Sequence, residues 1–241
     1  MTDHLEEIYY CGDSKLLKAC FNGDLDEVKK MIESNNTNND ETTLPILIAS
    51  YRGHIPIVKY LIENGSSPDD YDTNFEGHSS LMIFIENNDI DGIKLLLDKN
   101  CNIEHKNAVG QTAILLAVEL GYINIVKILI DHGANVNVLD ETGFSPLFIA
   151  ISLKNKKIIN LLIESGANVN LITNDCNDIP ITPLDYAHKV LSIKINNTFI
   201  ILERYLSIFT DLLKADAKKV SELSKKPVKS IGLKRSLTET I

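Results

Sequence analysis

The chain has 241 residues, of which 44% are hydrophobic and 24% charged, so its composition excludes wholesale disorder. Its net charge is −9, but residues 214–241 hold eight Lys/Arg against three Asp/Glu, a net of +5, which leaves −14 for residues 1–213. Because an acidic body repels phosphates, we expect it to bind no nucleic acid. No apolar run approaches about 18 residues and the first residues are acidic, so we expect no membrane association and no export.

The four cysteines show no Cys-x-x-Cys motif and no zinc-finger spacing, and the six histidines are scattered. We therefore expect reduced packing thiols, no metal site and no cofactor, although a cysteine with a histidine partner could be a nucleophile. No phosphate-binding loop, zinc-protease, hydrolase or kinase motif occurs, and we predict that the chain has no catalytic residues and is not an enzyme.

In chain order, residues 1–13 form an extension, after which weakly related copies of one pattern begin. Residues 16–19 lead to Gly23 and then to an apolar stretch at 28–32, and a similar order recurs around Gly53. Asparagines 35–39 indicate a loop between the two copies, and residues 66–74 indicate a longer one before the next. These segments predict helix pairs with irregular connections.

The central part of the chain repeats without gaps, because Gly77, Gly110 and Gly143 each stand 33 residues apart. Each copy predicts two short helices, such as 113–120 and 123–131, the first closing near Gly121 and the second ending at a left-handed Gly133. Thr112, Ser145 and Thr182 are the predicted N-caps. Helices this short are unstable alone, so neighbouring copies must stack.

The last copy begins at Thr182 and loses the pattern after Ala187, with an insertion near residues 193–197. Apolar residues at helical spacing predict a terminal capping helix over 199–213. The basic residues 214–241 are interpreted as a solvated, disordered tail, with a targeting signal, contacts to acidic surfaces and a kinase site at Ser236 as the alternatives.

The pattern Gly-x-Thr-Pro-Leu-x-x-Ala, then Gly, then Ile-Val-x-x-Leu-Ile-x-x-Gly-Ala-Asn-Val-Asn resembles the ankyrin repeat over residues 14–213. The resemblance implies an all-α solenoid of stacked helix-turn-helix units with projecting β-hairpin loops. It also implies that the hairpin tips and the inner face of each first helix bind other proteins. The expected units are 14–38, 39–73, 74–106, 107–139, 140–173 and 174–213.

The sequence departs from the family pattern at several positions. Phe84 replaces a small alanine and Asn88 a glycine, so we expect local distortion in the third unit. Lys154 replaces the same glycine in the fifth unit. The usual histidine after Thr-Pro-Leu is absent, so apolar packing must replace its hydrogen bonds between units.

Carried over position by position, the resemblance implies a concave partner-binding stripe that mixes apolar and acidic residues. We expect Phe75, Phe144 and Leu153 to be its apolar anchors, although such residues could instead pack against the loop of the next unit. The stripe comprises Tyr51, Arg52, Phe75, Glu76, His78, Glu86, Asn87, Val109, Gln111, Glu119, Leu120, Glu141, Phe144, Ser152 and Leu153.

We therefore predict a monomeric protein–protein interaction module in the cytoplasm, acting as an adaptor, scaffold or effector. The alternative is a nuclear regulatory protein, whose acidic stack binds a basic factor and whose basic tail directs import. The Ile-, Lys- and Asn-rich composition indicates an AT-rich genome. If the source is an intracellular pathogen or virus, the location could be the cytoplasm or nucleus of a host cell.

Overall fold

The structure is a computed structural model that describes residues 14–34, 43–71, 77–174, 179–195, 198–201 and 206–215. The chain divides into two compact units, residues 1–167 and 168–241, and each is described by itself. The predicted extension at 1–13 and almost all of the basic tail lie outside the described residues.

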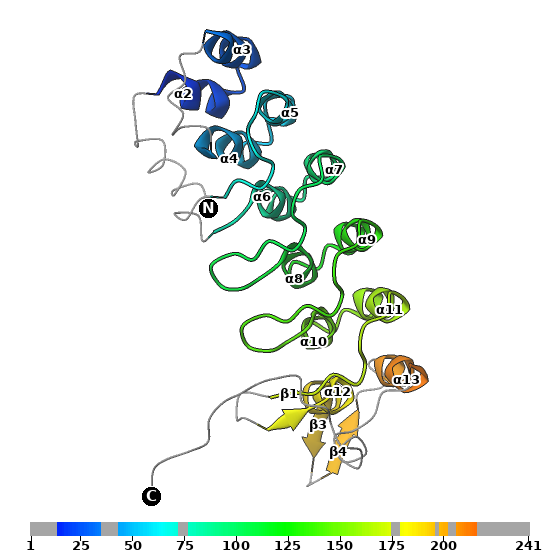
Figure 1. Ribbon diagram of the computed structural model, residues 1–241. Coiled ribbons are helices and arrows are strands. Elements are labelled where there is room, and N and C mark those ends of the chain that lie inside the picture. The colour runs from blue at the N-terminus through cyan, green and yellow to red at the C-terminus, as the bar shows by residue number, and fades with distance from the viewer. Residues whose placement is uncertain are drawn as a thin grey trace, which may run out of the picture. The chain divides into compact units, whose positions relative to one another are not determined.

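Helix pairs repeat along the first unit, each pair joined by a short turn (Figure 1). The predicted helices at 113–120 and 123–131 are confirmed, with differences of no more than one residue at an end. The pairs are α2 (Lys15–Asn22) with α3 (Leu25–Glu33), α4 (Thr43–Tyr51) with α5 (Ile55–Glu63), α6 (Ser80–Glu86) with α7 (Ile90–Asp98), α8 (Ala113–Glu119) with α9 (Ile123–Asp131), and α10 (Pro146–Ser152) with α11 (Lys156–Glu164).

The first helices α2, α4, α6, α8 and α10 contact one another in chain order and form one column. All six residues from 113 to 118 in α8 are buried, because this helix lies between α6, α10 and its own second helix. The second helices form the other column and bury one face only, as Ile125, Val126 and Leu129 do in α9. Stacking therefore supplies the core that no single pair could form.

The turns between the two helices of a pair all use the left-handed backbone region. Gly53 has φ +70° and Gly121 has φ +74°, and the left-handed Gly133 is also confirmed at φ +88°. Asn88 and Lys154 adopt the same conformation without being glycine, at φ +54° and +58°. The geometry of the repeat therefore overrides the preference of these two residues.

The expected distortion at Phe84 is absent, since α6 has the same seven-residue length as α8 and α10. Phe84 is fully buried, and a β-carbon added at Gly92 of α7 would collide with its ring. The fourth repeat has Ala117 and Ile125 at these two places. In the third repeat the large side chain is therefore on the first helix, whereas in the fourth repeat it is on the second. The two side chains together fill a similar volume, so the backbone does not change.

The three predicted N-caps differ in what their side chains do. Thr112 and Ser145 occupy the cap positions of α8 and α10, but neither side chain makes a capping hydrogen bond. Thr182 behaves as predicted: its Oγ1 accepts from the Asp185 amide at 3.2 Å, and Asp185 Oδ2 accepts from the Thr182 amide at 3.4 Å. This reciprocal arrangement is a capping box.

The second unit contains two short antiparallel strand pairs and two helices that pack together. Thr173 pairs with Ile181, and Ser192 pairs with Ile201. The elements are β1 (Thr173–Asn174), β2 (Pro180–Ile181), α12 (Pro183–Leu191), β3 (Ser192–Ile195), β4 (Thr198–Ile201) and α13 (Leu206–Lys214).

The predicted capping helix over 199–213 is wrong in its first part, because Thr198–Ile201 is strand β4 and the helix begins at Leu206. The sequence carries a signal for the strands: two isoleucine-rich runs are separated by Asn196 and Asn197. Residues that are β-branched or aromatic on both sides of a two-residue polar link are typical of a hairpin. The helical spacing of the apolar residues concealed that signal.

Candidate partner-binding surface

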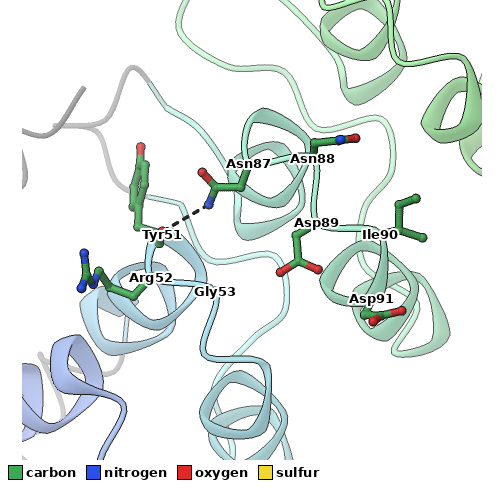
Figure 2. A pocket seen from close by; sticks show the side chains of 8 residues that line it. All are labelled: Tyr51, Arg52, Gly53, Asn87, Asn88, Asp89, Ile90 and Asp91. Carbon is green, nitrogen blue, oxygen red and sulfur yellow. Dashed lines mark hydrogen bonds between the residues drawn. The ribbon is translucent and has the colours of Figure 1, made fainter.

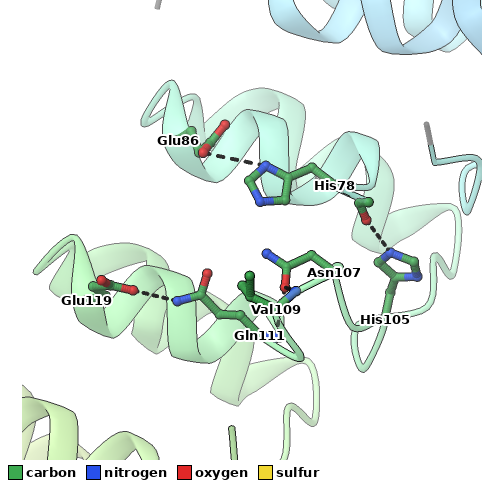
Figure 3. A network of polar contacts seen from close by, with 8 residues as sticks. His78, Glu86, His105, Asn107, Val109, Gln111 and Glu119 are labelled. Atoms are coloured by element: carbon green, nitrogen blue, oxygen red, sulfur yellow. Dashed lines mark hydrogen bonds and ion pairs between the residues drawn. The ribbon is translucent and has the colours of Figure 1, made fainter. Parts of the chain in front are cut away.

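Two polar pairs lie along α6 and α8, each joining the residue before the N-cap to the last residue of the same helix (Figure 3). His78 Nδ1 lies 3.5 Å from Glu86 Oε1, and the Gln111 side-chain amide donates to Glu119 at 2.5 Å. The His78 side chain is only 9% exposed, so it is shielded from a partner. Each pair holds a carboxylate in a fixed place at the end of a first helix.

The fifth repeat replaces this polar pair by an apolar contact. Phe144 stands at the position of Gln111, and its ring stacks on Phe148 with centroids 5.3 Å apart and planes at 7°. Ser152 stands at the position of Glu119 and is exposed. Because Phe144 is half-buried and one side of its ring is covered, it offers less free surface than a fully exposed anchor would.

The loops before α8 and α10 project from the helix columns and are each built around one side chain (Figure 1). Asn107 Oδ1 accepts from the Val109 amide at 3.2 Å and the Gln111 amide at 2.8 Å. Asp140 Oδ1 accepts from the Phe144 amide at 2.8 Å in the same way. Val109, at the tip, is 57% exposed. The Asn107 amide also donates to the Gln111 carbonyl oxygen, and the Asp140 amide to that of Phe144, each at 3.0 Å, so both loop tips are closed across a short turn.

Neighbouring loops are joined by side-chain contacts. One of these side chains, Glu141, belongs to the predicted site. His105 Nε2 lies 2.8 Å from the Gly77 carbonyl oxygen, and Lys106 donates to the Leu139 carbonyl at 3.3 Å. A β-carbon at Gly110 would collide with the Glu141 side chain, which therefore covers this glycine. Glu141 is exposed, yet its aliphatic part packs between two repeats.

The ends of the first helices and the turns that follow them recur at equivalent places in four successive repeats, and we name this set of residues the turn row. It consists of residues 51–54, 86–91, 119–124 and 152–157. Leu120 and Leu153 stand at the same place in adjacent repeats, and they are 41% and 47% exposed. Asn87 stands at this place in the third repeat and donates to the carbonyl oxygens of residues 50 and 51, at 3.4 and 3.2 Å.

A hollow of about 470 Å³ opens in the turn row between the second and third repeats, lined by residues 51–53 and 87–91 (Figure 2). Asp89 Oδ1 accepts from the Gly92 amide at 3.0 Å and so caps α7, while Asp91 is exposed in the first turn. The Arg52 guanidinium lies 4.5 Å from the centre of the Phe21 ring, and its Nε donates to the Phe21 carbonyl at 3.4 Å. The arginine is therefore held by the first repeat.

The structure separates the predicted site residues by exposure. Phe75 and Glu76 lie outside the described residues, and His78 is buried, so the expectation that it lies exposed in the stripe is wrong. Those with exposed side chains are Arg52, Asn87, Val109, Glu119, Leu120, Glu141, Ser152 and Leu153, and those that are half-buried are Tyr51, Glu86, Gln111 and Phe144.

Sequence reasoning missed the charged residues at the start of the second helices. Asp89 and Asp91 lie at this place in the third repeat, and Lys156 and Lys157 in the fifth. The signal was present in the repeat. A second helix predicted to start at residue 123 implies, at a period of 33, second helices that start near residues 90 and 156. The stripe carried over from the family ended at Asn87 and Leu153, two to four residues before these charged residues.

Among the described residues no group of three or more metal-ligating side chains comes together, and no helix of that part of the chain could span a membrane. Cys20 and Cys101 are buried free thiols, and burial raises the pKa of each to about 12. Thiols with pKa values this high stay protonated near neutral pH and are poor nucleophiles. These two cysteines are packing residues; Cys11 and Cys176 lie outside the described residues.

Comparisons with known proteins agree with this geometry. A family model described as "Ankyrin repeats (3 copies)" matches residues 16–107 and 81–173. An ankyrin repeat domain from Acinetobacter baumannii is similar in structure, with a TM-score of 0.67 and 26% identity over 84% of this chain and 98% of that one. The ankyrin repeat domain of Bcl-3, a member of the IkappaB family, gives a TM-score of 0.70 at 23% identity, over 86% and 88% of the two chains.

One curated relative matches over a short segment. The BTB/POZ domain-containing protein 3 of Schizosaccharomyces pombe is 41% identical over 56 residues, which are 22% of this chain. The chain spans about a tenth of the length of that protein, since the match covers 11% of it.

Proposed function

Because the chain belongs to the ankyrin repeat family, whose repeats are generally protein–protein interaction modules, we propose that it is an adaptor or scaffold that binds a partner protein through its loop tips and first helices. We further propose that it works in the cytoplasm and does no chemistry itself. The observation that carries the proposal is the exposure of Leu120 and Leu153, at 41% and 47%, in adjacent repeats.

These leucines are unusual in their surroundings. The first helices bury almost every apolar side chain against their neighbours, as residues 113–118 of α8 do. Leu120 and Leu153 are the C-caps directly after α8 and α10, so each has a fixed backbone and a projecting side chain. Exposed aliphatic side chains on a rigid base, with Glu119 beside Leu120 and Lys154 beside Leu153, suit an interface in which charged residues surround an apolar centre.

The test is capture of partners from a lysate of the source cell by the full chain and by Leu120→Glu/Leu153→Glu. Because both side chains are exposed, the variant should keep its helical circular dichroism. We expect it to lose the captured partner. Leu213→Glu is the matched control, because Leu213 is 58% exposed and lies outside the turn row. Equal capture by both variants and the native chain would contradict the proposal.

A nuclear regulatory role is the second candidate, and the charge distribution favours it. Residues 214–241 carry a net charge of +5, and their lysine clusters are of the kind that import receptors bind. A fluorescent fusion lacking residues 216–241 keeps α13 intact, since this helix ends at Lys214. If the shortened fusion leaves the nucleus, import depends on the tail; an unchanged distribution would contradict the nuclear role.

A further inference from the structure

We propose that the turn row binds a linear segment of a partner protein whose side chains are ordered by charge: basic, then aliphatic, then acidic, from the second repeat toward the fifth. The inference rests on the proposed function and names the chemistry of the partner. It follows from the order of charges along the row, which changes from acidic at the hollow to basic at the fifth repeat.

The acidic end is the hollow between the second and third repeats (Figure 2). One oxygen of Asp89 caps α7, and Asp91 is exposed one residue into this helix. Neither carboxylate has an ion pair among the described residues, and Arg52, the cation of the lining, lies over the Phe21 ring. A lysine or arginine of a partner would supply the missing positive charge.

The middle of the row is apolar. Leu120 and Leu153 stand at the place that Arg52 and Asn87 occupy in the second and third repeats. The helices that they follow, α8 and α10, are in contact. Two exposed leucines on adjacent repeats fit two aliphatic side chains of one segment. Glu119, next to Leu120, extends the acidic character of the row this far.

The basic end consists of Lys154, Lys156 and Lys157, all exposed and directly after Leu153. Lysines at the first two positions of α11 oppose the positive end of the helix dipole, whereas α7 has Asp91 in its first turn. Lys154 also adopts φ +58° where Gly53 and Gly121 stand in other turns. The three exposed lysines concentrate positive charge at this end of the row, and we assign Lys157, at the second position of α11, to a carboxylate of the partner.

The spacing sets the length of the segment. Helices of adjacent repeats lie roughly 8–10 Å apart, so the hollow and the lysines are separated by about 20–25 Å. An extended chain rises about 3.3 Å per residue, so six to eight residues, roughly, would cover this distance. A nucleic acid fits less well. Its phosphates are negative along the whole strand, so those near the hollow would be repelled by Asp89 and Asp91.

The test is a selection from a displayed library of random 12-residue peptides against the full chain, followed by fluorescence anisotropy with the enriched peptides. We expect enrichment of peptides with the order basic, aliphatic, acidic. The decisive variant exchanges the two ends, Asp91→Lys/Lys157→Glu, which leaves the net charge unchanged. It should bind these peptides about tenfold more weakly and should select the inverted charge order.

Asp98→Lys/Lys127→Glu is the matched control, since both side chains are exposed on second helices outside the turn row, and it should behave as the native chain does. The inference would be overturned if no peptides are enriched, if the enriched peptides show no charge order, or if the native and exchanged chains select identical peptides. Preferential binding of a labelled single-stranded oligonucleotide would overturn it as well. Such a result together with loss of partner capture by Leu120→Glu/Leu153→Glu would leave the proposed function standing.

Discussion

The third and fourth repeats build the same backbone from different side chains. The third has Phe84 in its first helix facing Gly92 in its second, whereas the fourth has Ala117 and Ile125 at these places. The third turns at Asn88 and caps its second helix with Asp89; the fourth turns at Gly121 and has the uncapped Tyr122. The repeat therefore fixes the backbone and the summed volume of a contact, but not which helix contributes the volume.

The largest expected effect is that of Phe84→Ala, which empties a fully buried site that faces a glycine. We expect the free energy of unfolding to fall by about 3–5 kcal/mol, measured by urea denaturation. Phe84→Ala/Gly92→Ile gives the third repeat the residue types of the fourth, and should recover most of the lost free energy of unfolding. A double variant no more stable than Phe84→Ala would show that the two positions do not share one packing volume.

Gly92→Ala should destabilise by about 1–3 kcal/mol, because its β-carbon collides with the Phe84 ring. Alanine has a higher helix propensity than glycine, so in the absence of the collision the same change would stabilise α7. In the Phe84→Ala background we therefore expect Gly92→Ala to raise the urea midpoint. The same sign in both backgrounds would rule out a direct conflict between the two side chains.

Asp89→Ala removes the hydrogen bond that caps α7 and should cost about 1 kcal/mol in thermal or urea unfolding. The fourth repeat supplies the reverse experiment, since Tyr122 is the N-cap of α9 and makes no capping hydrogen bond. We expect Tyr122→Asp to stabilise the chain by a similar amount. If neither variant changes the midpoint, capping does not distinguish the two repeats energetically.

The smallest effect concerns the left-handed turns. Lys154→Gly should stabilise the chain by about 0.5–1 kcal/mol, because glycine adopts φ +58° without a steric penalty. Asn88→Gly should gain less, since asparagine tolerates this region better than lysine does. The inferred role of the turn row adds a second readout. The Lys154→Gly variant should bind peptides with an acidic end more weakly, because it has one positive charge fewer, although its urea midpoint rises.

The periodicity of the sequence was enough to predict the stack. The spacing of 33 residues between Gly77, Gly110 and Gly143 places helices, turns and left-handed residues in every copy, because these depend on local backbone preferences. The exposed Leu120 and Leu153 of the candidate site could also be named in advance, since their place in the repeat determines their exposure. The identity of the partner does not follow from this pattern.

Only the tertiary structure decided which side chains meet across helices and repeats. It buried His78 against Glu86, placed Phe84 over Gly92, and held Arg52 on Phe21 beside a hollow with two carboxylates. In the second unit, strand pairing between Ser192–Ile195 and Thr198–Ile201 overrode a helical spacing that predicted one continuous helix. Local sequence sets the backbone, but these contacts depend on how neighbouring elements are oriented, and no short-range pattern encodes that orientation.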